Sequence, residues 1–494
     1  MTVLDWTICG LYLALIALQG WWFSGRQSSN EEYFVGSRRI NWGAVGISVF
    51  ATNFSALSFV GLLREAAYED YHLFLAKLLV PLAVVPVVAW VFIPIYQRIQ
   101  LISAYEYLGR RFDRRVRLIG SALFSLYTLG WMGTMLYAAG LILQSVLGLD
   151  DTGMVWAIVA VGLFTTAYAT AGGIRAIVWT DLSQSIVLGG AMLTILVLAL
   201  QKIDGGLHTV WATGVEHGKF QMFDFRFDLS VRGNFYSACA YGFFVYLAHH
   251  AISQSYVQRY VSTRDVGAAR RSLAVHSVLL VVACLLFFVL GTTIFTYYQL
   301  HPHSPGQAFP VLASQDQLAT HFVLAELATP GLLGLLMAGL LTAMMSSIDS
   351  GINNLAAVLT FDWFSGRNPS VKQSRLISLG FGGAAIVTAL ATPLVGTHVF
   401  DIIIRLGGAL FGPLLGLFAL GMFSSRSNTG GALVGLAAGI TALLIATQTE
   451  VSHWWYGAFT SVSTFAVGFS ASLLFSPPSD AVLDGLIVGS TRHR

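Results

Sequence analysis

Small polar residues cluster at the centre of an apolar stretch that runs from Gly339 to Asp362. Positions i, i+3, i+4 and i+7 of the helix predicted here form one face, which holds Ala343, Ser346, Ser347 and Ser350. A neighbouring stripe holds Ser346, Asp349, Ser350 and Asn353. Both stripes offer only oxygen donors and have no cysteine nearby, which suits a hard cation such as Na⁺ better than a transition metal.

Asp349 decides between two interpretations of this stretch. Serines in membrane helices commonly form a buried polar seam that joins two helices, and such a seam needs no ligand. A carboxylate at the depth of a bilayer, however, costs about 2.5–3.5 kcal/mol on insertion scales unless a cation offsets its charge. Asp349 therefore favours a cation-binding face over a packing seam.

Composition assigns the chain to the membrane. Of its 494 residues, 55% are hydrophobic and only 10% are charged, whereas soluble domains carry about 25% charged residues. The net charge of +3 does not indicate a nucleic-acid partner, because basic loop residues are needed to orient membrane helices. The three cysteines all lie in apolar runs and predict no disulfide. We therefore expect an all-α polytopic membrane protein whose main partner is the lipid bilayer.

Apolar runs of about 20 residues are long enough to cross a bilayer, and the chain has thirteen of them. They lie near residues 4–23, 43–66, 73–96, 118–147, 153–171, 176–201, 234–257, 273–298, 331–360, 376–396, 399–423, 429–448 and 454–475. Basic residues, Arg259 among them, gather in the loops on one side, while the other side holds only Lys202, Lys219, Arg226 and Arg232. The positive-inside rule then places the N-terminus outside and the C-terminus in the cytoplasm.

The same pattern predicts the domain organisation. Residues 1–475 are expected to form a single transmembrane domain, and residues 476–494 a weakly ordered cytoplasmic tail. The external loops at 202–233 and 299–330 are too short for domains and are expected to hold short helices or a lid.

Two of the spans carry an unusual number of polar residues. The second span has Asn53, Ser55 and Ser58 at its centre, and the seventh has His249, His250 and Ser253 near its inner end. If residues 43–201 and 234–423 are two five-helix repeats, these spans open them, and interrupted helices at matching positions indicate a transport site. The alternatives are hydroxyls that bond back to their own helix and histidines that are ordinary core residues rather than proton carriers.

Three further charges fall inside predicted spans. Asp181 is either an acid near the start of a helix, favoured by the helix dipole, or a second carboxylate for a cation. Lys77 lies one turn into the third span, too deep to reach the outer surface easily. Arg405 follows Asp401 at i+4, so an ion pair is the simple explanation for it.

Several motifs, in order along the chain, resemble the sodium/solute symporter family, and the resemblance extends over nearly all of it. They are EEYFVGSRR before the second span, SVFATNFSALSFVG within it, ISAYEYLGRRFDRRVR after the third, GGIRAIVWTDLSQ into the sixth, SQSYVQRY in the seventh and SSIDSGINNLAAVLTFDWF. Among the members, bacterial sialic acid and sugar symporters look most similar. The resemblance implies a LeuT-type fold of five-plus-five inverted repeats, with one helix before the repeats and two after.

The resemblance also implies site residues. A principal sodium site would use the carbonyls of Ala51, Phe54 and Ala343 with the hydroxyls of Ser346 and Ser347. A second sodium site, present in some members, would fall on Asp181, Ser346, Asp349 and Ser350. The substrate contacts would be Asn53, Ser55, Ser58, Lys77, Trp131, Ser253 and Arg405.

The chain departs from its sialic acid relatives in the substrate set. Where those members have an arginine that clamps the substrate carboxylate, this chain has Gly130 followed by Trp131. Lys77 replaces a neutral or acidic residue, so an anion remains a plausible substrate, held from a different side. A sugar or polyol stacked on Trp131 is the other possibility.

We therefore expect a sodium-coupled symporter, not an enzyme, that works as a monomer in the bacterial inner membrane. It would import a small polar solute such as a sugar, sugar acid or other carboxylate by alternating access, with one or two Na⁺ ions. The rival on the same fold is a proton-coupled transporter that uses Asp349 or Asp181. A receptor would need a soluble domain, for which the tail leaves no room, and a membrane enzyme would need a nucleophile and base or a metal cluster.

Overall fold

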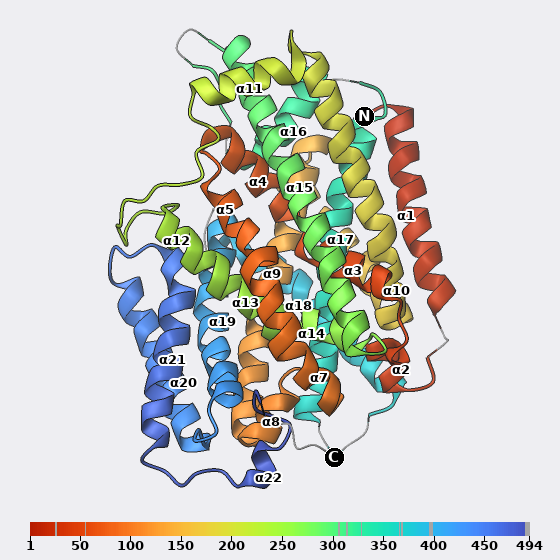
Figure 1. Cartoon of the computed structure of the whole chain (residues 1–494). Coiled ribbons are helices and arrows are strands. Elements are labelled where there is room, and N and C mark those ends of the chain that lie inside the picture. Colours follow the sequence, from red (N-terminus) through yellow and green to blue (C-terminus); the bar gives the residue numbers. More distant parts are fainter. Residues whose placement is uncertain are drawn as a thin grey trace.

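The computed structural model describes residues 1–24, 27–54, 56–304, 307–312, 315–327, 329–364, 366, 369–394 and 399–489, with side chains except at 56, 57, 59, 60, 316 and 399–406. These residues form a bundle of helices that run mostly along one direction (Figure 1). The part of the chain described contains no β-strand. The prediction of an all-α protein is confirmed.

Each predicted span falls on a helix or on a set of consecutive helices. Unbroken spans are α1 (Val3–Phe23), α9 (Arg114–Leu147), α15 (Val266–Leu300), α17 (Leu332–Val358), α18 (Val371–Ala391), α19 (Val399–Phe423), α20 (Thr429–Thr447) and α21 (Tyr456–Ser472). Interrupted spans are α3 (Trp42–Asn53) with α4 (Ala56–Tyr68), α5 (His72–Leu79) through α7 (Ile93–Ile99), and α12 (Phe235–Ala240) through α13 (Tyr246–Ile252) to α14 (Gln254–Val261). Within the described residues, eight helical stretches are by themselves long and apolar enough to cross a membrane.

Helix α10 (Asp151–Gln201) supplies two spans at once. Its 51 residues would extend about 76 Å at 1.5 Å per residue, more than twice the hydrocarbon thickness of a bilayer. The helix breaks at Gly173, whose φ of 61° is the left-handed conformation that favours glycine. A Cβ at Gly173 would lie 2.6 Å from the Tyr33 carbonyl oxygen. The glycine therefore permits both the bend and the close approach of the segment before α3.

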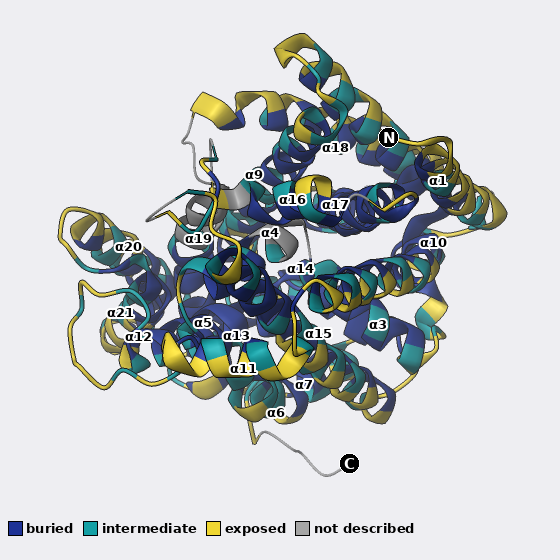
Figure 2. Cartoon of the chain, turned by 90° about the horizontal axis from the view of Figure 1, so that it is seen from above, coloured by how far each residue is buried: buried dark blue, intermediate teal, exposed yellow. Residues whose placement is uncertain are grey.

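Helix α17 occupies the centre of the bundle. Nearly every residue in it is buried, and it is surrounded by other helices when the protein is viewed from above (Figure 2). By contrast, α1 at the periphery buries only one narrow stripe. The buried polar residues of α17 are thus placed at the middle of the protein, away from lipid.

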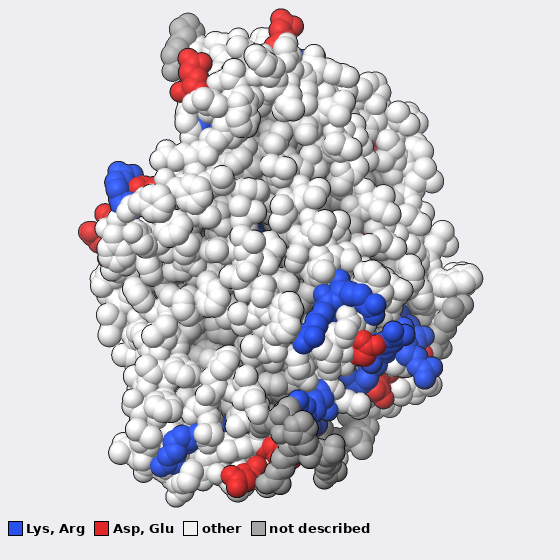
Figure 3. Space-filling model, in the orientation of Figure 1, with Lys and Arg blue, Asp and Glu red and all other residues white. Residues whose placement is uncertain are grey.

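Charge follows the predicted topology. The middle of the surface in Figure 3 is almost free of charged side chains, and Lys and Arg gather toward the lower end. Helix α22 (Asp480–Leu483) lies at that end, and the N-terminus lies toward the other end (Figure 1). An uncharged belt with a basic end is the arrangement that the positive-inside rule requires of a membrane protein.

The external connection between α10 and α12 packs on the bundle. It contains the short helix α11 (Gly206–Glu216), as expected for this loop. Lys219 Nζ donates to the carbonyls of Ala67 and Glu69 at 2.7 Å each. Burial lowers the pKa of Lys219 to about 8.

The tail is more ordered than we expected. It contains α22 (Asp480–Leu483), and Leu486 beyond it is buried. The Tyr107 hydroxyl donates to the Leu486 carbonyl at 3.1 Å, and the Val488 N–H donates to Met422 O at 2.9 Å. The described part of the tail is therefore held against the bundle by hydrogen bonds of its backbone atoms, which side-chain polarity does not predict.

Candidate functional site: two broken helices around a buried ion face

The second span breaks between α3 and α4. Phe54 has extended backbone angles, φ −94° and ψ 94°, and so ends α3. Where a helix stops, the last carbonyls lose their intrahelical partners and become available as ligands. The carbonyl of Ala51 belongs to this last turn. Ser55, predicted to contact substrate, lies outside the described residues.

Oxygen atoms from the break and from α17 converge. Ser346 Oγ lies 3.4 Å from the carbonyl oxygens of both Ala51 and Ala343, and Ser347 Oγ lies 3.4 Å from Ala343 O. A hard cation that binds oxygens at about 2.4 Å holds adjacent ligands about 3.4 Å apart, which is this spacing. All four residues are buried, and Phe54 is buried beside them. Four of the five residues predicted for the principal sodium site thus place carbonyl and hydroxyl oxygens beside each other, and Phe54 is the residue at which α3 ends.

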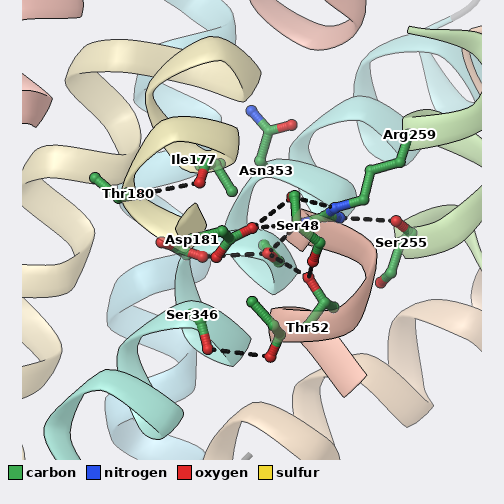
Figure 4. A network of polar contacts seen from close by, with 12 residues as sticks. Ser48, Thr52, Ile177, Thr180, Asp181, Ser255, Arg259, Ser346 and Asn353 are labelled. Atoms are coloured by element: carbon green, nitrogen blue, oxygen red, sulfur yellow. Dashed lines mark hydrogen bonds and ion pairs between the residues drawn. The ribbon is translucent and has the colours of Figure 1, made fainter. Parts of the chain in front are cut away.

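A second polar cluster lies beside the first, and its centre is an ion pair. The guanidinium of Arg259 on α14 lies 3.1 Å from the Asp181 carboxylate on α10, and neither side chain is exposed. Ser48 on α3 bridges the pair: its Oγ donates to Asp181 at 2.5 Å and accepts from Arg259 Nε at 2.7 Å (Figure 4). Arg259 also donates to Ser350 Oγ on α17 at 2.7 Å. Four helices therefore meet at one guanidinium.

Arg259 corrects the sequence analysis, which counted it among the basic residues of the cytoplasmic loops. It is fully buried. A hydropathy pattern assigns an arginine that ends a span to the adjacent loop. Nothing in the sequence around Arg259 indicates that three other helices supply its partners. The structure also shows that Asp181 is more than an acid near a helix start, because it pairs with this arginine.

Asp349 lies in the same cluster but has no cation of its own among the described residues. The Tyr168 hydroxyl donates to its Oδ2 at 2.7 Å, and Ser350 Oγ donates to its Oδ1 at 3.2 Å. Oδ1 of Asp181 is buried and has no hydrogen-bond partner in the described part of the chain. Two carboxylates therefore face one guanidinium, and an uncompensated buried charge is costly. The cluster has the composition of a site for one further cation.

The seventh span breaks at Ser253, whose ψ of 131° separates α13 from α14. Its freed carbonyls are held on the cytoplasmic side. Tyr96 donates to Ala251 O at 2.6 Å, and Tyr105 donates to Ile252 O at 3.2 Å. Interrupted helices thus occur in both predicted repeats, at the positions where the sequence placed them.

A cavity of about 100 Å³ lies between the two breaks. Five of the predicted substrate contacts line it: Asn53, Ser58, Lys77, Trp131 and Ser253. Ser347 and Thr52 also line it, so the cavity adjoins the sodium face directly. The side chain of Arg405 on α19 is outside the described residues.

The cavity wall also contains residues that were not among the predicted substrate contacts. They are mostly aromatic or hydroxylic: Tyr127, Thr128, Tyr241, Tyr246, Ser255 and Tyr256. Trp131 and Tyr127 stack with ring centroids 6.2 Å apart, which makes one wall flat and apolar. Aromatic residues at helical spacing look like ordinary packing residues in a sequence, so only the fold reveals that these face a cavity.

Among the described residues that line the cavity, Lys77 is the only one of the types Lys, Arg, Asp and Glu. Its Nζ lies 4.6 Å above the centre of the Tyr246 ring. No carboxylate pairs with it in the described residues, and it is half-buried. A desolvated ammonium without a counter-ion attracts an anion.

The two histidines of the seventh span lie in different surroundings. His249 lines the cavity and stacks on Phe411, with ring centres 4.7 Å apart. His250 is a buried core residue whose Nδ1 lies 2.8 Å from Tyr246 O and whose Nε2 lies 3.0 Å from His276 Nε2.

Comparisons with known proteins agree with this site. The profile of the sodium:solute symporter family matches residues 33–439. The sodium/sialic acid symporter SiaT of Proteus mirabilis is 31% identical, covering 96% of this chain and 95% of that protein. The sodium/sialic acid symporter NanT of Aliivibrio fischeri is 30% identical over 94% and 92%, and the human sodium/iodide cotransporter 32% over 89% and 69%.

Solved structures give the same answer for the fold. A substrate-bound, outward-open Na⁺-coupled sialic acid symporter superposes with a TM-score of 0.89 at 29% identity, covering 96% of this chain and 99% of that one. The nucleobase-cation symporter Mhp1 superposes with a TM-score of 0.60 at 16% identity, over 93% and 99%, and supports the fold alone. The predicted LeuT-type fold is confirmed. The chain belongs to the sodium:solute symporter family, and it is an integral membrane transporter that couples a solute to sodium, not an enzyme.

Proposed function

We propose that the protein imports a small organic monoanion, such as a sugar acid or another carboxylate, together with Na⁺. The observation that carries the proposal is the position of Ser347. Its hydroxyl lies in the cluster of oxygens on α17, and the same residue lines the cavity. An ion bound there touches the wall of the solute site. The unpaired Lys77 across the cavity supplies the charge that favours an anion.

The principal sodium ion is assigned to Ala51, Phe54, Ala343, Ser346 and Ser347. Spacing, burial and an all-oxygen donor set support this assignment. A second ion is assigned to Asp181, Ser346, Asp349 and Ser350. The unpartnered Oδ1 of Asp181 and the excess of carboxylates over guanidinium support it. We assign the solute to the cavity residues, with Ser55 and Arg405 as further contacts from the resemblance.

Relatives bear on the choice of solute. Two of them are sodium/sialic acid symporters, which agrees with an acidic solute. The flat wall formed by Trp131 and Tyr127 suits the apolar face of a sugar ring, and Lys77 suits the carboxylate. We therefore rank a sugar acid first within the carboxylate class.

Coupling follows from the position of the ion. Na⁺ between the carbonyl of Ala51 and the hydroxyls of α17 would tie the broken α3–α4 span to α17 and complete the wall of the cavity. Ion and solute then raise each other's affinity by the same factor. Opening toward the cytoplasm separates these oxygens and releases both. The membrane potential adds about 2.3 kcal/mol per charge per 100 mV to the sodium gradient.

Proton coupling on the same fold is the second candidate. The charges of the second cluster support this candidate. A proton on one of the two carboxylates would balance the net charge of the cluster as well as Na⁺ does. Uptake measured in sodium-free buffer separates the two.

The protein is proposed to work as a monomer, because one chain supplies both ion clusters and the cavity. No nucleic-acid partner is proposed, since the basic residues serve membrane orientation. In a bacterium such a transporter lies in the inner membrane.

The test is the thermal stability of the purified protein in Na⁺ against K⁺ or choline, across a panel of sugars, sugar acids and carboxylates. A ligand that binds only the folded protein raises the melting temperature by mass action. A sodium-specific rise, enlarged by one carboxylate, is the expected result. Equal melting temperatures in Na⁺, K⁺ and choline at every pH would contradict sodium coupling.

A further inference from the structure

One hydrogen bond joins the sodium-bearing helix to the broken helix of the solute cavity. Asn354 lies on α17 one turn after Ser350, and its side chain is buried. Its Nδ2 donates to Ser255 Oγ at 2.6 Å. Ser255 lies in the first turn of α14, two residues after the break, and lines the cavity. The bond therefore runs from the helix that carries Ser346 and Ser347 to the surface that meets the solute.

The backbone of Ser255 is held from the same region. Its carbonyl accepts from Arg259 Nη1 at 2.7 Å. The same guanidinium contacts Asp181 and Ser350 (Figure 4). The hydroxyl and the carbonyl oxygen of Ser255 thus both accept hydrogen bonds from groups linked to the ion clusters. Asn354 lies on α17, and Arg259 contacts two residues of the second cluster. A shift of α17 would move this serine directly.

The direction of the bond determines what the Ser255 hydroxyl can do. An amide nitrogen donates, so Asn354 occupies one lone pair of Ser255 Oγ and leaves its O–H to be given elsewhere. No acceptor for this O–H exists among the described residues. The cavity is the open side of Ser255, so the hydroxyl is oriented as a donor toward a bound solute, for which a carboxylate oxygen is the best acceptor.

We propose that Asn354 is a positioning residue that couples sodium to solute: it holds the Ser255 hydroxyl toward the solute carboxylate as long as sodium keeps α17 in place. The inference rests on the proposed function, because it takes the ion face and the anionic solute as given. Asn354 touches neither ligand and acts through Ser255.

The readout is the coupling factor, the ratio of solute dissociation constants without and with saturating Na⁺. The solute is whichever of N-acetylneuraminate, gluconate and lactate gives wild-type protein the largest sodium-dependent rise in melting temperature. Coupling factors between sites commonly lie between about 5 and 150. We expect Asn354→Ala, and Asn354→Leu as a variant of similar shape, to lower the factor at least fivefold while the protein keeps its sodium-induced thermal shift.

A double-mutant cycle then separates positioning from general packing. If Asn354 acts through the hydroxyl, Ser255→Ala lowers the coupling factor as much as Asn354→Ala, and the double variant is no worse than either. The matched control is Gln258→Ala. It removes a buried amide on α14 that donates to Asn353 on α17 at 2.9 Å and so also links the two helices, but Gln258 does not line the cavity. Its coupling factor should stay at the wild-type value.

Two outcomes overturn the inference: a wild-type coupling factor in both Asn354 variants, or single-variant losses that multiply in the double variant. An equal loss in Gln258→Ala would also overturn it, since any bond between the two helices would then suffice. If wild-type protein shows no sodium-dependent shift with any of the three solutes, the proposed function fails instead.

Discussion

The sodium face and the solute cavity are adjacent, yet they are built in different ways. Most of the oxygens that we assign to sodium come from one helix, α17, at spacings of three and four residues, and we assign further carbonyls at the break in α3–α4. The cavity wall comes from the α3–α4 span, α5, α9, the α12–α14 span and α19, with α17 closing one side. The difference teaches that an ion site can be encoded locally, whereas a solute site depends on how distant helices meet.

The largest effect is expected at the shared ligand. Ser346→Ala removes an oxygen assigned to both sodium ions, and we expect it to abolish sodium-driven uptake in proteoliposomes while the protein still expresses. The matched control is Ser374→Ala, a buried serine on α18 distant from the ion face, which should transport normally. Unchanged sodium dependence in Ser346→Ala would remove the site assignment.

The buried ion pair predicts a stability effect. Asp181→Asn leaves the Arg259 guanidinium with no carboxylate in contact, and removing one partner of a buried pair costs about 3–5 kcal/mol. The melting temperature in detergent should therefore fall sharply. Asp224→Asn, which breaks an exposed surface pair with Arg226, should leave it nearly unchanged. Similar small changes in both variants would mean that Asp181 is not ionised in the protein.

Substitution of Lys77 tests the solute cavity without removing a residue that we assign to sodium. A hydrogen bond to a charged group contributes about 1.5–3 kcal/mol, so Lys77→Gln should weaken binding of the carboxylate solute by roughly 10-fold or more. Sodium affinity, followed by thermal shift without solute, should change much less. Lys202→Gln, at an exposed external position, serves as the control. A larger change in sodium affinity than in solute affinity would move Lys77 out of the solute site.

The smallest effect sharpens the identity of the solute. If a sugar ring stacks on Trp131, Trp131→Leu loses an aromatic contact of about 0.5–1.5 kcal/mol, or roughly 2- to 13-fold in affinity. A compact carboxylate that does not reach the ring would bind with unchanged affinity. Competition binding of gluconate and lactate to this variant measures the difference.

The sequence groups the residues of the proposed ion face for a physical reason. Helical spacing and residue type were enough to group Ser346, Ser347 and Asp349, because one helix presents them whatever surrounds it. The thirteen spans follow in the same way, because the bilayer requires about 20 apolar residues for each crossing.

The rest depends on contacts between distant segments. Arg259 was assigned to a loop because hydropathy cannot see that Ser48, Asp181 and Ser350 converge on it. Tyr127 has the pattern of a packing residue. Ser255 and Tyr256 belong to the SQSYVQRY motif, but the motif does not indicate which of its side chains face a cavity. Tertiary structure alone brings these side chains to one cavity.

The most direct test of sodium-coupled import is solute accumulation in proteoliposomes under an imposed ion gradient. With the solute identified by thermal shift, an inward Na⁺ gradient should drive uptake, and an interior-negative potential should increase it. An inward proton gradient in sodium-free buffer should give no uptake. Accumulation driven by protons alone, with none from sodium, would contradict the account and make Asp349 and Asp181 the residues to examine as proton carriers.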